Sequence, residues 1–232
     1  MRKVLAALLM ALILLVAATA AEVQEGRQAV SVGDIVSFGC YEQDSDLENG
    51  PEAIEWIVLD CDEENHRVLL LSRFGLDTRP YHSEYADVTW ETCSLRAWLN
   101  DEFLSAAFSG DEQAAILFTA VDNSDAQGYS DNDTTGGNDT EDRIFLLSLA
   151  EADRYLEGRT GERAIVTPTA YAAAGGAEIY ADGTASGWLL RSPGYQQNYV
   201  STYGSVYYGC SADDATVVLR PAVWVNLESG II

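Results

Sequence analysis

The C-terminal third of the chain contains Gly187-Trp188-Leu189-Leu190-Arg191-Ser192-Pro193-Gly194 and, after a Tyr- and Gly-rich run, Leu219-Arg220-Pro221-Ala222-Val223-Trp224-Val225. Each segment encloses one arginine in apolar, strand-like sequence. An unpaired guanidinium is costly in such surroundings, so we expect Arg191 and Arg220 to contact a carboxylate or several carbonyl groups. Their predicted role is to hold the C-terminal sheet against the helical part of the domain, and clamping of a ligand is the alternative.

Strand patterns lie at both ends of the chain. The N-terminal ones are separated by polar turns and predict a meander over residues 35–38, 53–59 and 67–71. The C-terminal ones cover residues 144–147, 188–190, 198–208 and 216–225. The third of these folds back at Tyr203-Gly204 as a hairpin.

In the middle of the chain, apolar residues recur at the spacing of an α-helix. Leu95, Trp98, Leu99 and Phe103 recur at that spacing, so we expect a helix over residues 94–104 that buries all four side chains and is capped by Thr92 or Ser94. Capping-box patterns begin at Ser109 and Ser148, and a short helix over residues 169–174 ends at Gly175-Gly176. Strands, central helices and closing strands predict a single α+β domain.

Three sequence blocks resemble one family. They are Thr89-Trp90-Glu91-Thr92-Cys93-Ser94-Leu95-Arg96-Ala97-Trp98-Leu99-Asn100, Gly137-Asn138-Asp139-Thr140-Glu141-Asp142-Arg143-Ile144-Phe145-Leu146-Leu147-Ser148 and a C-terminal block that consists of the two arginine segments above. Together they are similar to the bacterial domain of unknown function 6273. The resemblance identifies a domain whose family has no established activity.

Residues 187–226 also resemble the C-terminal pattern of the C-type-lectin-like and formylglycine-generating-enzyme folds. The resemblance implies a C-type-lectin-like architecture, with an N-terminal meander, central helices and a C-terminal β-hairpin sheet. It also implies that the C-terminal loops form a binding face. Formylglycine-generating enzymes carry a pair of active-site cysteines near the C-terminus, where this chain has only Cys210.

The N-terminus has the three parts of a secretory signal. Met1-Arg2-Lys3 is charged, residues 4–16 are apolar, and Ala18-Thr19-Ala20 offers small residues for cleavage. We expect residues 1–21 to be a signal peptide, residues 22–30 a linker and residues 31–228 one globular domain. Alternatively, residues 4–21 remain uncleaved and anchor the protein in the membrane. The predicted location is secreted or extracytoplasmic.

The chain is strongly acidic, with 37 Asp and Glu against 13 Lys and Arg and a formal net charge of −24. Such a surface repels nucleic acid and anionic membranes, so neither is an expected partner, apart from a membrane anchored by an uncleaved N-terminus. Four cysteines, Cys40, Cys61, Cys93 and Cys210, permit up to two disulfides in three pairings, or free thiols. Their spacing does not select a pairing.

The loop over residues 131–142 has the oxygen spacing of a calcium-binding loop. Oxygen-bearing side chains stand at its first, third, fifth, ninth and twelfth positions, and a glycine stands at the sixth. The candidate ligands are Asp131, Asp133, Thr135, Asp139 and Asp142, and calcium is the one cofactor that the sequence suggests. A solvated acidic loop held by local turn hydrogen bonds is the alternative.

The C-terminal third is dense in aromatic residues, which offer flat apolar faces with polar rims suited to sugars or peptides. The candidate ligand-binding residues are Tyr195, Tyr199, Tyr203 and Arg191. The lectin-like resemblance implies an exported ligand-binding module for a glycan or a cell-surface protein. The alternatives are an oxidoreductase or other enzyme with a cleft near Cys210 and a structural envelope module. The sequence contains no GxSxG, HExxH, Walker or dinucleotide-binding motif.

Overall fold

The computed structural model describes residues 30–128, 135–156, 164–180, 183–192 and 197–232. The chain divides into two units, Met1–Ser31 and Val32–Ile232, and the elements below belong to the second. The predicted signal peptide and nearly all of the predicted linker lie outside the described residues. Among the residues that are described, no helix is both long enough and apolar enough to cross a membrane.

Strands and helices alternate in blocks, which confirms the α+β class. The strands are β1 (Ile35–Tyr41), β2 (Glu52–Asp62), β3 (Arg67–Ser72), β4 (Asp77–Thr78), β5 (Thr119–Val121), β6 (Thr140–Asp142), β7 (Ile144–Phe145), β8 (Trp188–Leu189), β9 (Gln197–Val200), β10 (Val206–Cys210), β11 (Val218–Leu219) and β12 (Ala222–Asn226). The helices are α2 (Ser94–Trp98), the π-helical turn η1 (Leu99–Phe103), α3 (Leu104–Ala107), α4 (Gly110–Ala115), η2 (Asp125–Gln127), α5 (Leu149–Tyr155), α6 (Ala170–Ala174) and η4 (Leu227–Ser229).

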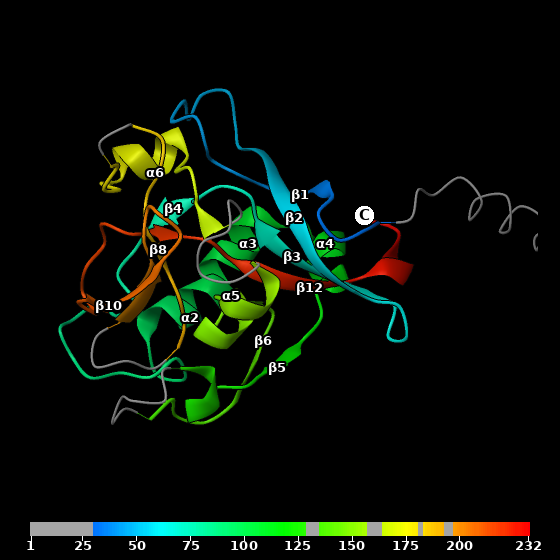
Figure 1. Cartoon of the computed structure of the whole chain (residues 1–232). Helices are drawn as coiled ribbons and strands as arrows, with labels where there is room; N and C mark the ends of the chain where they lie inside the picture. The colour runs from blue at the N-terminus through cyan, green and yellow to red at the C-terminus, as the bar shows by residue number, and fades with distance from the viewer. Residues whose placement is uncertain (1–29, 129–134, 157–163, 181–182, 193–196) are drawn as a thin grey trace, which may run out of the picture. The chain divides into compact units, whose positions relative to one another are not determined.

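The first main sheet has the order β1-β2-β3-β12-β7, with every pair antiparallel. Its first three strands are the predicted meander, and the C-terminal strand β12 lies beside β3 (Figure 1). Trp56 of β2 is fully buried, and its indole N–H donates to the carbonyl of Phe38 at 2.6 Å. The bond satisfies the polar edge of a side chain that otherwise fills the core.

The second main sheet has the order β10-β9-β8-β11-β4. The hairpin of β9 and β10 confirms the predicted fold-back, but the single strand predicted over residues 216–225 is wrong. The chain leaves this sheet after β11, passes through Arg220-Pro221 and enters the first sheet as β12. Proline has no N–H to donate to a ladder, so the change of sheet falls where strand pairing is already weakened.

Arg220 stands at this crossing. Its Nε donates to the carbonyl of Ser72 in β3 at 2.8 Å, and its guanidinium lies 5.2 Å from the ring centroid of Trp188 in β8. The side chain is almost fully buried. Arg220 therefore joins the two main sheets.

The predicted helix over residues 94–104 exists, but two of its expected details are wrong. The N-cap is Cys93, whose Sγ accepts a hydrogen bond from the backbone N–H of Arg96 at 3.4 Å. Trp98 is only half-buried: one wall of a surface cavity is formed by its side chain, and the guanidinium of Arg79 stacks on its ring at 4.1 Å from the centroid. Leu95, Leu99 and Phe103 are buried as expected.

Local capping patterns were predicted correctly. Ser109 and Ser148 each form a complete capping box, with Glu112 and Glu151 respectively. The segment over residues 122–142 contains more structure than its polar sequence suggests, because η2 and β6 lie within it and β6 pairs with β5. The hydrophobic pattern missed β6 because two of its three residues are charged.

Candidate functional site

Arg191 lies in the core, where all of the five N–H groups of its guanidinium find acceptors. Two go to the carboxylate of Glu151 in a fork, and the others go to the carbonyls of Leu146 at 2.8 Å and Asp122 at 3.0 Å and to Oδ1 of Asn123 at 3.3 Å. Glu151 also caps α5. Arg191 therefore fastens the end of β8 to α5 and to the loop before η2.

Asp142 forms a second buried polar group. Its carboxylate accepts hydrogen bonds from the indole N–H of Trp90 at 2.8 Å, from Nε of Arg96 at 2.6 Å and from the hydroxyl of Thr140 at 2.7 Å. Trp90 and Asp142 are each about 1% exposed. The carboxylate thus ties α2 and the segment before it to β6.

Asn123 joins the two groups into one network. Its side-chain amide donates to the hydroxyl of Thr140 at 3.2 Å, and its carbonyl oxygen accepts from Arg191. Three residues of the sequence blocks, Arg96, Asp142 and Arg191, therefore belong to one connected set of hydrogen bonds. These blocks build the scaffold of the domain.

The predicted calcium ligands are not assembled among the described residues. Asp142 is engaged by Arg96, Oδ1 of Asp139 accepts the backbone N–H of Asn123 at 2.9 Å, and Thr135 is exposed. Asp131 and Asp133 lie outside the described residues. Calcium binding stays a prediction.

Two of the predicted ligand-binding residues do meet in a cavity. Tyr199 of β9 and Tyr203 of the hairpin turn line a cavity of about 290 Å³ with Tyr180, Glu178 and Thr202. Arg191 does not line it, because that side chain is committed to the core, and Tyr195 lies outside the described residues. The aromatic cavity, defined by Tyr180, Tyr199 and Tyr203, is the candidate binding site.

The rings at the mouth of the aromatic cavity are open to solvent. Tyr203 is 69% exposed and Tyr180 is 46% exposed, and their rings make an edge contact with centroids 5.8 Å apart. Neither phenol hydroxyl makes a hydrogen bond within the described part of the chain. Both are therefore available to a ligand.

The wall that carries Glu178 and Tyr180 is tied to the second sheet through backbone bonds. The N–H of Glu178 donates to the carbonyl of Thr216 at 2.8 Å, and the N–H of Tyr180 donates to the carbonyl of Ala185 at 3.0 Å. These bonds attach the segment of Glu178 and Tyr180 to the residues that precede β11 and β8 of the second sheet. Sequence reasoning missed Tyr180, because only the fold brings it next to Tyr203.

Gly187 keeps part of the aromatic cavity open. A Cβ at this position would lie 3.1 Å from the carbonyl oxygen of Val200, 3.2 Å from Cδ2 of Tyr199 and 3.3 Å from Cγ1 of Val217. Such contacts are tighter than a side chain normally tolerates. A larger residue would therefore push against the Tyr199 ring.

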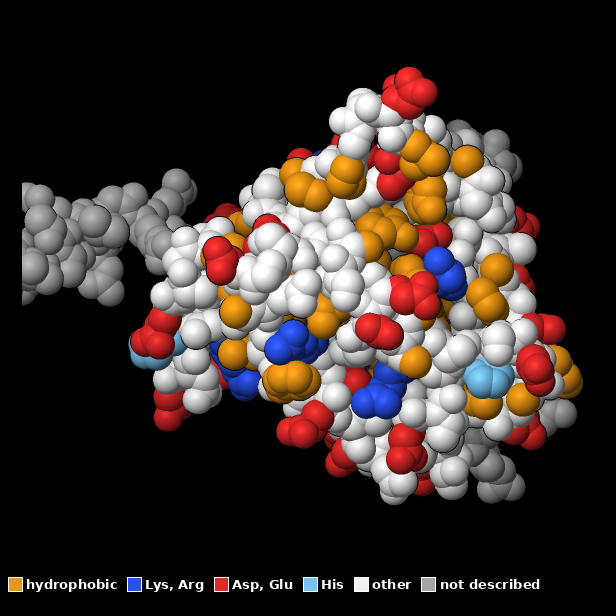
Figure 2. All heavy atoms as spheres, turned by 180° about the vertical axis from the view of Figure 1, so that it is seen from behind, with side chains coloured by type: hydrophobic (Ala, Val, Ile, Leu, Met, Phe, Trp, Pro, Cys, Tyr) orange, Lys and Arg blue, Asp and Glu red, His pale blue; other side chains and the backbone are white. Residues whose placement is uncertain are grey.

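The rim of the aromatic cavity carries one carboxylate, Glu178, which is exposed and accepts no hydrogen bond from the residues that the structure describes. Elsewhere the acidity is dispersed: on the face shown in Figure 2, acidic side chains are spread over the surface and basic ones are few. On this face the negative charge therefore acts as a general field rather than as one acidic patch.

Cys40, Cys61, Cys93 and Cys210 all lie in the described ranges, and none of them forms a disulfide in this structure. Burial, with Asp214 and Asp213 nearby, raises the pKa of Cys210 to about 12, and burial raises the pKa of Cys93 to about 12 as well. Thiolate is the reactive form, so neither thiol is activated at neutral pH. These properties give no support to thiol chemistry near Cys210.

Thiol labelling of the folded protein checks this assignment. We expect Cys40, which is exposed, to react first with an alkylating reagent at neutral pH, and Cys93 and Cys210 to react only after unfolding. Mass spectrometry of the labelled peptides reads out the order. Labelling of Cys210 as fast as that of Cys40 would show that its thiol is activated after all.

The chain was compared with protein families, curated proteins and solved structures, and a family model matches it. No curated protein and no solved structure matches the chain, so the C-type-lectin-like architecture stays a prediction. Residues 65–227 match the family model for the Domain of unknown function (DUF6273). The matched range contains all three sequence blocks and the polar network that they form. The chain therefore belongs to the DUF6273 family.

Proposed function

We propose that the protein is an exported ligand-binding module that receives a glycan in its aromatic cavity. The observation that carries the proposal is the convergence of Tyr180, Tyr199 and Tyr203 from two separate segments on one cavity. Aromatic faces pack against the apolar faces of sugar rings, and phenol hydroxyls and a carboxylate at the rim suit sugar hydroxyls. The charged n-region and apolar run of residues 1–21 support export.

A glycan fits this cavity better than a protein surface does. Stable protein interfaces bury roughly 800 Å² on each partner and are broadly flat, whereas pockets of roughly 300 Å³ upward hold small ligands. The aromatic cavity, of about 290 Å³, has the size for one or two sugar residues at its mouth. A cell-surface protein partner would instead need a contiguous apolar patch around the Tyr203 turn.

The expected result for Tyr203→Ala is loss of glycan binding without loss of fold. Removing this exposed ring should weaken binding about tenfold or more, because aromatic anchors dominate the energetics of such contacts. Tyr85→Ala is the matched control, because Tyr85 is also well exposed, at 78% against 69% for Tyr203, and does not line the cavity. A glycan array identifies the ligand, and calorimetric titration of the wild type and both variants measures the affinity.

The same titration tests the rival functions. The titration is run with and without calcium, because the spacing of oxygen-bearing side chains in residues 131–142 is typical of a calcium-binding loop. Binding that Tyr203→Ala and Tyr85→Ala weaken equally would contradict a site at the aromatic cavity. A wild-type protein that binds no glycan in either condition would leave the structural envelope module as the better proposal.

A further inference from the structure

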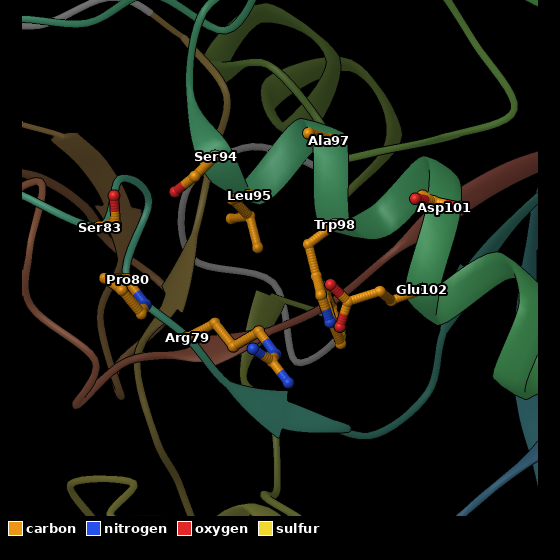
Figure 3. Close-up of a pocket in the computed structure, with 9 residues that line it drawn as sticks. All are labelled: Arg79, Pro80, Ser83, Ser94, Leu95, Ala97, Trp98, Asp101 and Glu102. Carbon is orange, nitrogen blue, oxygen red and sulfur yellow. The ribbon is translucent and has the colours of Figure 1, made fainter.

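A second cavity, of about 350 Å³, lies between α2 and the segment that follows β4. Figure 3 shows the residues that define this charged cavity: Arg79 and Ser83 on one wall, and Ser94, Trp98, Asp101 and Glu102 on the other. It shares no lining residue with the aromatic cavity. Its function is therefore a separate question.

Arg79 presents a pre-oriented cation to the charged cavity. Its guanidinium stacks on the ring of Trp98, 4.1 Å from the centroid, and its Nε lies 3.7 Å from Oδ2 of Asp77. Asp77 is held in turn by the hydroxyl of Tyr41 at 2.7 Å. The two terminal nitrogens of Arg79 make no hydrogen bond to any described residue, so they offer the planar fork that binds a carboxylate with two bonds.

Two carboxylates occupy the opposite wall. Asp101 and Glu102 follow Trp98 by about one helical turn and stand beside it on the same side of the helix. Both are exposed, and neither side chain accepts a hydrogen bond within the described ranges. In Figure 3 the carboxylate of Glu102 lies next to the Trp98 ring and faces the same space as Arg79.

The carboxylates sit on the π-helical turn η1 (Leu99–Phe103), a rare geometry that is frequent at functional sites. Asn100 stabilises the turn, because its amide N–H groups donate to the carbonyl of Arg96 at 3.1 Å and to that of Ile144 at 2.8 Å. Its Oδ1 accepts from the backbone N–H of Arg143 at 2.8 Å. The acidic wall is therefore fixed to the scaffold at β7.

The arrangement of charges selects the ligand class. An anion alone would be attracted by Arg79 but repelled by Asp101 and Glu102. A cation alone would be attracted by the two carboxylates but repelled by Arg79. A molecule with both charges satisfies both walls. We propose that the charged cavity binds a small zwitterion, in its simplest form a free α-amino acid, with its carboxylate on Arg79 and its ammonium group at Asp101 and Glu102. The volume is at the lower end for ligand pockets and suits a molecule of that size.

The first test uses the wild-type protein alone. It is titrated calorimetrically with a panel of free α-amino acids at about 150 mM salt, which screens general attraction to the acidic surface. We expect at least one to bind, and its N-acetyl and methyl-ester derivatives, which each lack one charge, to bind about tenfold more weakly or worse. The dipeptide of the same residue shows whether a peptide with both ends free is the better ligand. If no amino acid or dipeptide binds, or if the derivatives bind equally well, the proposal is overturned.

The second test uses substitutions to show whether the amino acid binds in the charged cavity. Arg79→Gln and Glu102→Gln should each weaken binding of the best amino acid about tenfold. Arg154→Gln should not change it. Arg154 is a close match for Arg79, because it also stacks on an aromatic ring, that of Tyr155 at 4.8 Å, and also pairs with an aspartate, Asp60 at 3.6 Å.

Unchanged affinity in both cavity variants would place the ligand elsewhere and overturn the proposal. Tyr203→Ala should bind the amino acid as the wild type does. A failure of the glycan proposal is thereby separated from a failure of this one.

Discussion

Replacing Arg191 with methionine is expected to lower the free energy of unfolding by about 3–5 kcal/mol, because the change removes the buried partner of a part-buried ion pair together with the donors of three further hydrogen bonds. It leaves the carbonyls of Leu146, which is buried, and of Asp122 without the Arg191 donor, and the carboxylate of Glu151 keeps only its capping contact with Ser148. Total stabilities of single domains are roughly 5–15 kcal/mol, so the loss is a large share. The denaturation midpoint in urea measures it.

Arg73→Met is the matched control for this prediction. Arg73 also pairs with a glutamate, Glu55, but both side chains are well exposed, at 46% and 39%. Exposed pairs contribute about 0–1 kcal/mol, so the midpoint should hardly move. Equal shifts in the two variants would contradict the predicted structural role of Arg191 and would favour the alternative role, the clamping of a ligand.

Replacing Asp142 with alanine is expected to cost a similar amount, about 3–5 kcal/mol. The substitution removes the one acceptor that the described residues offer to the Trp90 indole N–H, together with the carboxylate that pairs with Arg96. The buried N–H is then left unsatisfied, and Arg96, which is about one-quarter exposed, loses its counter-ion. Thermal or urea denaturation without added calcium measures the effect.

The neighbouring residue supplies the control. Glu141 is exposed, and Glu141→Ala should change stability by no more than about 0.5 kcal/mol. If Asp142→Ala were as stable as Glu141→Ala in the absence of calcium and differed only when calcium is added, Asp142 would act as a metal ligand and not as part of the scaffold.

Features set by short-range sequence were predictable. The two capping boxes and the hairpin at Tyr203-Gly204 depend on residues within a few positions of each other, and the structure has them. The need of Arg191 for buried partners also followed from its apolar neighbours. The sequence could not indicate which partners these were, because Glu151 and Asn123 are distant in the chain.

Features set by tertiary contacts were missed. Trp98 fits the buried stripe of its helix, yet the fold places Arg79 over its ring and leaves it half-buried. Residues 216–225 have one apolar pattern but serve two sheets, because apolar periodicity does not specify a strand's partner. Tyr180 reaches the aromatic cavity only through the backbone bonds of its segment to Thr216 and Ala185.

NMR mapping of amide chemical-shift changes during addition of the glycan ligand tests most directly whether the aromatic cavity is the binding site. We expect the largest shifts at the amides around the aromatic cavity, those of Tyr180, Gly187, Thr202 and Tyr203, with little change at Ser83 and Glu102 in the charged cavity. Shifts confined to other surfaces, or the absence of shifts at a glycan concentration well above the measured dissociation constant, would contradict it.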